Sequence, residues 1–598
     1  SLQRLMAIAV LLLVGTPAFA QFERSRVAGT IRDQQGGVMP GVAVTATNQA
    51  TNQAETAITD ATGFYSFSTL LPGQYTFSAE LQGFKKATRS NAQLDAAGAI
   101  TLDFVLETGD LSEEVTVTAE AAQLQTDVAL RKTVEAKDIE QLSFNGRNPI
   151  GVAGLKAGVS GGSFNNYGTF SLSNGGWNIN GSRGDENNIT VDGATAVRTR
   201  SNGAIVGVQN VDTVQEVQVL TGNYMPEYGR ASGGQVRIIT KSGSNRFSGT
   251  AGYYYRDDKL QANTWSRNRS TNAAENSGAA PFDFKQYGYS IGGPILRNRL
   301  FFFGAQEWAK QDATATAIIT VPTAAMRRGD FSELLNPANG FFSGARVIRD
   351  PLTNEPFPGN VIPQERLSAN GLAMLALYPE PTPGFRQGSA NAIITSENPQ
   401  EQRKDNIRFD WRPAASHQLS YRFSKSSYKA LDAFRGNLPF ARTDWDRPNF
   451  TTTASWTSTW KSNIVNELTF TAGRYDVYIN VYTDSGLHQR SRTGINYPYI
   501  FAEKEISDKI PTITGTGFQD VDGGPYPASS SGPITTVTNT TTYVKGRHTF
   551  KAGVAFEYSG EDDFDQINVS AIPGSTNNQN GRFEFSDSRA GGTGLGMS

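Results

Sequence analysis

Residues 211–258 read VDTVQEVQVLTGNYMPEYGRASGGQVRIITKSGSNRFSGTAGYYYRDD, and this stretch decides the fold. Its first part predicts an alternating β-strand that begins near Glu216 and turns at Tyr228-Gly229-Arg230. The pair Gly233-Gly234 allows close backbone approach or a positive φ. In the last part, aromatic and small residues alternate with polar ones, which is the pattern of a strand in a transmembrane barrel. The stretch therefore predicts the passage from a small α+β domain, residues 121–243, to a β-barrel.

The clearest barrel signal is a hairpin at residues 407–423. Its apolar residues share one face, and its charged and polar residues share the other: Ile407, Phe409, Trp411, Leu419, Tyr421 and Phe423 against Arg408, Asp410, Arg412, Gln418, Ser420 and Arg422. Lipid accepts the first face and a water-filled lumen accepts the second. We therefore predict that residues 244–598 are the N-terminal part of a transmembrane β-barrel in outer-membrane lipid, with long extracellular loops. A soluble all-β protein is the alternative.

Strand number and loop length set two further expectations for this region. About ten strands can be placed after Arg246, whereas plugged outer-membrane transporters close with about 22 strands. The sequence is therefore expected to be a fragment with a truncated barrel. The loop at about residues 310–404 is long enough to be functional, and Trp308, Tyr378 and Phe385 are candidate ligand contacts. These aromatic residues can equally serve only to pack the loop, so the ligand-binding residues remain unknown.

Several motifs before the barrel resemble the plug domain of TonB-dependent outer-membrane receptors, and most of all the Oar-like subfamily. The motifs occur in the family's order: Asn180-Gly181, Val191-Asp192-Gly193, Val214–Leu220, Glu227-Tyr228-Gly229, Gly233-Gly234 and Ile238–Gly243. The resemblance implies that residues 121–243 fill a barrel lumen. It makes Glu227 and Arg230 candidates for ion pairs between plug and barrel, with a solvated role as the alternative for each.

Residues 108–120 are predicted to form a linker that contains the string LSEEVTVTAE, residues 111–120. An extended segment between domains can add a strand to a partner's sheet. The string resembles the TonB box of the same receptors, carried here by Glu114, Val115, Thr116, Val117, Thr118 and Ala119. An ordinary edge strand is the alternative interpretation.

The N-terminal region is predicted to hold a signal peptide and a β-sandwich. Arg4, the apolar run Leu5–Val14 and Ala18-Phe19-Ala20 follow the order of a secretory signal peptide, residues 1–20, cleaved near Ala20. Short strands separated by turns then predict a sandwich over residues 21–107. Residues 26–107 resemble the carboxypeptidase regulatory-like domain, a transthyretin-like sandwich grouped with carbohydrate-binding-like folds. A role in sugar binding would rest on that analogy alone.

Composition excludes several classes of function. With 54 Lys and Arg against 56 Asp and Glu, the net charge of −2 gives no basic surface for nucleic acid. The chain has 0 cysteines and 3 scattered histidines, and it lacks the G-x-S-x-G, H-E-x-x-H and phosphate-loop motifs. We therefore expect no enzyme activity, no catalytic residues, no metal site and no cofactor. A secreted hydrolase with β accessory domains is the rival interpretation that these absences oppose.

Together, the sequence predicts a mostly β protein with a signal peptide, a transthyretin-like sandwich, an α+β plug and a partial barrel. The resemblance implies a TonB-dependent receptor that captures a scarce small or macromolecular ligand and imports it. Its partners would be TonB and the inner-membrane energising complex, driven by the proton gradient. The rival from another class is an outer-membrane adhesion or surface-binding protein without active transport.

Overall fold

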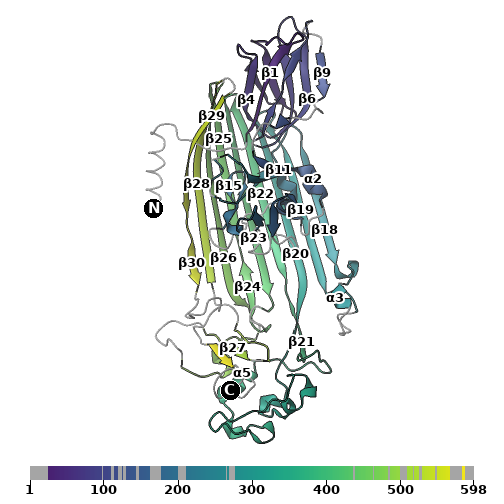
Figure 1. Cartoon of the computed structure of the whole chain (residues 1–598), viewed down its shortest axis with the longest axis vertical. Coiled ribbons are helices and arrows are strands. Elements are labelled where there is room, and N and C mark those ends of the chain that lie inside the picture. Colours follow the sequence, from purple (N-terminus) through teal and green to yellow (C-terminus); the bar gives the residue numbers. More distant parts are fainter. Residues whose placement is uncertain are drawn as a thin grey trace.

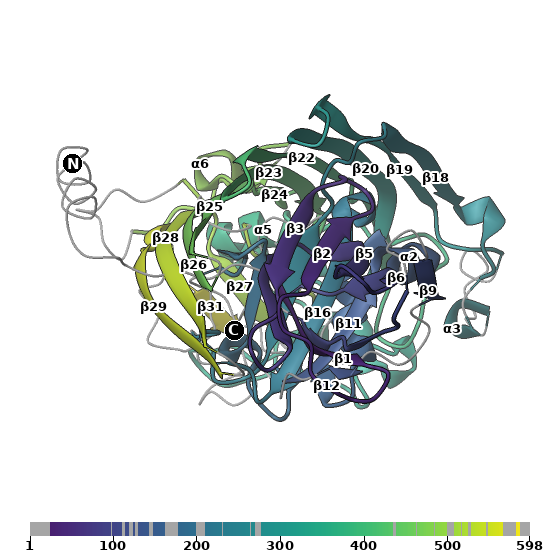
Figure 2. The same cartoon turned by 90° about the horizontal axis from the view of Figure 1, so that it is seen from above.

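The computed structural model places a small sandwich at one end of a tall curved sheet, with a mixed domain inside the curve and folded loops at the other end (Figures 1 and 2). The structure describes residues 24–96, 98–109, 114–118, 124–125, 129–142, 147–161, 177–198, 210–225, 227–229, 231–263, 265–268, 277–434, 438–461, 463–482, 485–498, 508–515, 517–523, 528–545, 548–565 and 582–585. The proposed signal peptide, residues 1–20, lies outside this set, as do Ala119 and Arg230.

The sandwich consists of two sheets packed over one apolar core. One sheet has the order β3 (Ala54–Ile58), β2 (Ala43–Asn48), β5 (Gly73–Glu80), β6 (Lys86–Leu94) and β9 (Glu114–Thr118). The other has the order β10 (Leu124–Gln125), β7 (Ala99–Thr101), β1 (Ser25–Asp33) and β4 (Phe64–Leu70), with β8 (Phe104–Leu106) also paired to β1. Alternate residues of β1 and β2 are buried, so the period-2 pattern of the sequence does define the core face. Val27, Ile31, Tyr65 and Phe77 lie at its centre.

The TonB-box candidate is part of this sandwich. Strand β9 pairs in parallel with β6, and Glu114 lies opposite Lys86 while Thr118 lies opposite Ser90. The segment therefore forms an edge strand of the sandwich in this structure, and its pairing with β6 could not be predicted from the local sequence.

A mixed domain, here called the inner domain, lies inside the curved sheet (Figure 1). Its sheet has the order β11 (Leu130–Glu135), β16 (Val214–Gly222), β17 (Gln235–Thr240), β14 (Asn188–Val191) and β15 (Ala194–Thr195), and the helix α2 (Ala136–Gln141) follows β11. The alternation predicted for β16 is present in its side-chain directions, but both of its faces are buried. One face packs on the domain's own core through Val217 and Val219, and the other carries Glu216 and Gln218 against the sandwich.

The curved sheet has twelve strands within the described part of the chain. Its main path runs β18 (Ser248–Asp257), β19 (Phe282–Leu296), β20 (Leu300–Ile319), β22 (Gln400–Ala414), β23 (His417–Asp432), β24 (Arg442–Asp446), β26 (Ile464–Tyr482), β28 (Ala528–Lys545) and β29 (His548–Ser559). Three more strands join it: β21 (Ala392–Glu397), β25 (Asn449–Lys461) and β30 (Asp562–Asp565). Strands β18 and β29 form its two edges, so the described sheet is open. No described helix is long and apolar enough to cross a membrane.

The two ends of the curved sheet differ in their connections. Short turns, such as residues 297–299 and 415–416, join strands at the end that carries the sandwich. At the other end, residues 320–391 and the described residues between β26 and β28 form a folded cap, with the helix α5 (Ala369–Leu375) and the pair β27 (Thr512–Gly515) and β31 (Arg582–Phe585). The long predicted loop is thus shorter than expected, because β20, β21 and β22 extend into it, and apolar clusters hold the remainder together.

Candidate functional site

Four buried charged side chains, here called the wall cluster, join the inner domain to the barrel wall. Asp192 comes from the inner domain, whereas Arg408 and Asp410 lie on β22 and Arg422 on β23. The Asp192 carboxylate lies 2.9 Å from Arg422 Nε and 3.6 Å from Arg408 Nη1. Arg408 Nε also lies 2.9 Å from Asp410 Oδ2. All four side chains are buried, with two positive and two negative charges.

Local backbone geometry aims Asp192 at the wall. It follows β14 in a tight turn with φ 44°, and Gly193 continues the turn with φ 81°. Asp is one of the few residues with a side chain that tolerates this region, and Gly enters it freely. The carboxylate then accepts hydrogen bonds from Thr240 N at 2.9 Å and Thr240 Oγ1 at 2.6 Å. The motif Val191-Asp192-Gly193 is therefore a turn built to present one carboxylate.

The wall side of the cluster is equally satisfied. Arg422 donates to the carbonyl oxygen of Val191 and to Thr451 Oγ1, each at 3.0 Å. Arg408 donates to the carbonyl oxygen of Thr240 at 2.8 Å. The predicted inward direction of these arginines agrees with their burial, and their outward neighbours Ile407 and Trp411 are exposed. The expectation that they meet lumen water is wrong, because the inner domain occupies that space.

The two candidate residues for contacts between plug and barrel differ in outcome. Glu227 lies next to β29, where Lys551 Nζ is 2.7 Å from its Oε1. Both side chains are partly exposed, so this pair is weaker than the wall cluster. Arg230 lies outside the described residues. Sequence reasoning placed Asp192 in a family motif but did not find its role, because its partners follow more than 200 residues later.

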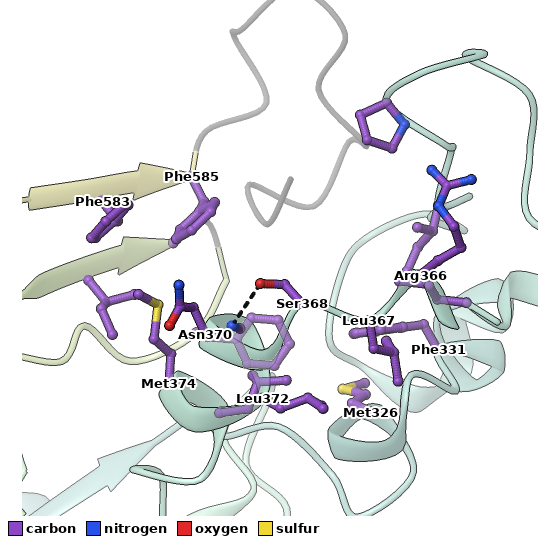
Figure 3. A pocket seen from close by; sticks show the side chains of 18 of the residues that line it. Met326, Phe331, Arg366, Leu367, Ser368, Asn370, Leu372, Met374, Phe583 and Phe585 are labelled. Atoms are coloured by element: carbon purple, nitrogen blue, oxygen red, sulfur yellow. Dashed lines mark hydrogen bonds between the residues drawn. The ribbon is translucent and has the colours of Figure 1, made fainter. Parts of the chain in front are cut away.

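A second candidate site is a cavity of about 600 Å³ in the cap. Its walls are mainly apolar and aromatic, and Phe331, Leu367, Met374, Phe583 and Phe585 point around one space (Figure 3). The volume lies in the range of small-molecule sites, which are concave and mostly apolar with a few polar groups.

The polar groups at the edge of this cavity are already engaged. Arg366 forms a two-point pair with Asp350, at 2.6 and 2.7 Å. The amide of Asn370 exchanges hydrogen bonds with the backbone of Asn496, at 2.8 and 2.7 Å. The cavity therefore offers an apolar surface rather than a free charge, which suits an uncharged apolar group.

The three aromatic residues named as candidate ligand contacts lie in different parts of the structure. Tyr378 lines the cavity. Trp308 does not belong to the cap, because it lies on β20 and stacks on Tyr287 of β19, with 5.6 Å between the ring centroids. Phe385 is half-buried in the cap and lies outside the cavity lining. Trp308 lies on the wall rather than in a loop because β20 continues to Ile319.

We expect the substitution Leu367→Trp to weaken binding of an uncharged apolar dye, N-phenyl-1-naphthylamine, about tenfold or more. Leu367 points into the cavity, so the larger indole removes the space that the dye needs. Fluorescence titration of the purified protein in lipid nanodiscs measures the effect. The control is Leu352→Trp, because Leu352 is 81% exposed. Equal affinity in the two variants would show that the dye does not bind in the cavity.

The cap should also loosen in acid through His488. Burial lowers the pKa of His488 below 6.5, opposed by Asp508 and assisted by Lys509 and Arg492. The folded cap thus binds the proton less readily than the unfolded segment, so its stability falls as the pH drops below about 6.5. Hydrogen exchange of residues 508–515, corrected for intrinsic rates, should be faster at pH 5.5 than at pH 7, and His488→Gln should reduce that difference. An unchanged difference in the variant would contradict the assignment.

The described residues contain no cluster of three or more His, Cys, Asp or Glu side chains placed to hold a metal ion. The chemistry that the two sites offer is therefore ion pairing between the domains and apolar contact with a ligand.

Comparison with known proteins places this architecture in a family. A model described as outer membrane beta barrel domain matches residues 239–596, and one described as carboxypeptidase regulatory-like domain matches residues 26–107. The TonB-dependent transporter Oar of Myxococcus xanthus is 32% identical over 314 residues, which are 50% of this chain and 28% of that protein. The chain thus spans little more than a quarter of this curated relative.

Solved structures with a similar arrangement include two outer-membrane proteins. The outer membrane transporter YddB from Escherichia coli shares 14% identity with a TM-score of 0.43, covering 72% of this chain and 48% of that chain. The siderophore receptor PirA from Acinetobacter baumannii shares 12% identity with a TM-score of 0.40, covering 75% and 50%.

The curated relative Oar is a transporter rather than an enzyme, which agrees with the expectation from the sequence and opposes the hydrolase alternative. The barrel match likewise overturns the soluble alternative and places the protein in the outer membrane. The chain belongs to the outer-membrane β-barrel family, carries a carboxypeptidase regulatory-like domain ahead of its barrel and is a homologue of the TonB-dependent transporter Oar.

Proposed function

We propose that this protein is a TonB-dependent outer-membrane receptor that binds a scarce ligand at its cap and imports it past the inner domain. The observation that carries the proposal is the wall cluster, which joins the inner domain to the curved sheet through buried, non-covalent contacts. The inner domain is then the plug expected over residues 121–243, ahead of the barrel at residues 244–598, except that residues 124–125 pair with the sandwich.

The orientation follows from the connections. Outer-membrane barrels have short turns on the periplasmic side and long loops outside. The cap with its apolar cavity then faces the exterior, and the sandwich over residues 21–107 faces the periplasm, after removal of the signal peptide. TonB reaches the linker at residues 108–120 from that side, and the proton gradient supplies the energy through the inner-membrane complex.

The wall cluster suits a plug because its contacts are strong but not covalent. Buried ion pairs hold two surfaces in one geometry, and they can re-form after the surfaces separate. The cluster is also compact, so a displacement of a few ångströms breaks all of its contacts together. A protein that only anchors an adhesive surface has no need for such a releasable contact.

The test is whether the inner domain moves when the membrane is energised. The chain has 0 cysteines, so a single introduced cysteine is a unique label site. Ala194 lies on β15, next to β25 and β26 of the barrel, and is buried. In growing cells, Ala194→Cys should react with a membrane-permeant maleimide, and an uncoupler of the proton gradient should suppress the reaction.

Two control variants give the expected upper and lower limits of this reaction. Leu352→Cys lies in the exposed part of the cap and should react with or without the uncoupler, whereas Ala46→Cys lies in the sandwich core and should stay unreactive. If Ala194→Cys reacts equally with and without the uncoupler, the inner domain does not respond to the proton gradient. The surface-binding alternative would then be preferred.

A further inference from the structure

The residue before β1, Arg24, leaves the sandwich and inserts into the barrel wall. Its side chain is buried among residues of three barrel strands. Arg24 Nη1 donates to Gln418 Oε1 at 2.6 Å, and Nη2 donates to Thr457 Oγ1 at 2.9 Å. Its Nε lies 3.6 Å from Glu467 Oε1.

The three partners of Arg24 form one row across three neighbouring strands. Gln418 of β23 lies opposite Thr457 of β25, and Thr457 lies opposite Glu467 of β26. Residues that face each other in a ladder point to the same side of a sheet. The row therefore makes a preformed site for a planar guanidinium, with one carboxylate to balance its charge.

The sandwich has further attachments at the same end of the barrel. Glu55 of β3 lies 3.5 Å from Arg412 of the wall. The backbone oxygens of Ala50 and Thr51 accept hydrogen bonds from Asn245, at 2.9 and 2.6 Å.

Another attachment joins the sandwich to the inner domain. Ala96 N donates to Glu216 Oε1 at 2.8 Å, and the oxygen of Ala96 accepts from Gln218 Nε2 at 2.7 Å. All three residues are buried, and both acceptor and donor side chains come from β16. Seen from above, the sandwich lies over β11 and β16 of the inner domain (Figure 2).

We propose that the sandwich closes the short-turn end of the barrel and so acts as a stopper. The contacts of Arg24 with Gln418, Thr457 and Glu467, here called the latch, hold it in that position. An inner domain that leaves or rearranges through this end must first displace the sandwich, because the sandwich is bonded both to the wall and to β16. This inference rests on the proposed function for its role in transport, but the docking itself is a property of the isolated protein.

Strand β9 is the part of the sandwich on which a pulling force would act first. It is the edge strand of the sandwich sheet and pairs with β6, so a pull on residues 114–118 acts on the sandwich before it acts on the inner domain. In this order, release of the latch precedes movement of the plug.

The experiment measures undocking in purified protein in lipid vesicles, without TonB or a proton gradient. Ala96→Cys places a thiol in the buried contact between sandwich and inner domain. Its rate of reaction with a maleimide should rise roughly tenfold or more when Arg24→Ala is added, because hydrogen bonds between a charged group and buried partners are lost. Arg24→Lys should give an intermediate rate, since an ammonium cannot reproduce the two-point contact.

The core residue Ala46 separates undocking from unfolding. Ala46→Cys should remain unreactive in the Arg24→Ala background, because the sandwich stays folded when it undocks. The exchange Arg24→Glu with Glu467→Arg should slow the reaction of Ala96→Cys relative to Arg24→Glu alone.

Either of two results overturns the proposal. One is an unchanged rate at Ala96→Cys after Arg24→Ala, and the other is an equal rise at Ala46→Cys. Neither result depends on transport, so a failure of the latch is distinguishable from a failure of the receptor function. Conversely, a rise in the reaction rate at Ala96→Cys after Arg24→Ala, together with no effect of the uncoupler on the reaction of Ala194→Cys, would support the docking role of the sandwich. That result would also contradict coupling to the proton gradient.

Discussion

Asp192→Ala is expected to release the inner domain from the barrel wall at a cost of about 3–5 kcal/mol. The substitution leaves Arg408 and Arg422 buried with only Asp410 to balance their charges. Removing one partner of a buried pair is costly because the remaining charge has already lost its water. Protease digestion of the purified protein in lipid nanodiscs should cut the inner domain at a much lower urea concentration than in the parent chain.

A matched control is available in an exposed ion pair of the same barrel. Lys429 Nζ lies 3.6 Å from Asp446 Oδ2, and both side chains are more than a third exposed. Asp446→Ala should therefore cost less than about 1 kcal/mol, since exposed pairs are screened by water. If Asp192→Ala and Asp446→Ala lower the urea concentration for cleavage equally, burial does not make the wall cluster more stabilising than an exposed ion pair.

A second substitution tests whether the loss of stability in Asp192→Ala comes from its interaction with Arg422. Arg422→Ala alone also leaves an unbalanced charge, but Arg422→Ala combined with Asp192→Ala removes one charge of each sign. The double variant should be less unstable than the sum of the two single variants, and the difference is their interaction energy. Additive effects would mean that Asp192 and Arg422 stabilise the contact independently.

The hairpin at residues 407–423 shows what could be predicted from the sequence alone. Side chains in a strand alternate with a period of two, so the inward direction of Arg408, Asp410 and Arg422 follows from their spacing. The register does not follow in the same way, because an irregularity in the ladder between Trp411 and Ala414 brings Trp411 opposite Leu419. What the charges meet could not be predicted, because Asp192 reaches them through tertiary packing across more than 200 residues.

The contacts of Arg24 and the structure of the cap could not be predicted either, for two different reasons. The row Gln418, Thr457 and Glu467 exists only after three strands are aligned, and nothing in the local sequence of Arg24 indicates that it enters the barrel. In the cap, 3₁₀ turns and apolar clusters replace the periodic pattern on which prediction depends. The burial of both faces of β16 could not be predicted, because the sandwich that covers its polar face is brought there only by tertiary packing.

Replacement of residues 114–119 by six alternating Gly and Ser residues is expected to abolish the interaction with TonB. The replacement keeps the length of the linker but removes the Val and Thr residues that favour a strand. TonB could otherwise pair with the outer edge of β9, since β9 ends its sheet and only β6 adjoins it in the described structure. Co-purification of the periplasmic domain of TonB with the protein in nanodiscs measures the interaction.

A conservative variant determines whether strand formation or side-chain identity matters. Thr116→Val with Thr118→Val keeps β-branched residues at both positions and should retain TonB, whereas the Gly and Ser replacement should lose it. Binding of the apolar dye in the cap should be the same in all three proteins, because the cap lies at the opposite end of the barrel (Figure 1). Retention of TonB by the Gly and Ser replacement would remove residues 114–119 from the coupling path. A surface-binding role would then account for the cap and its cavity without energy from the inner membrane.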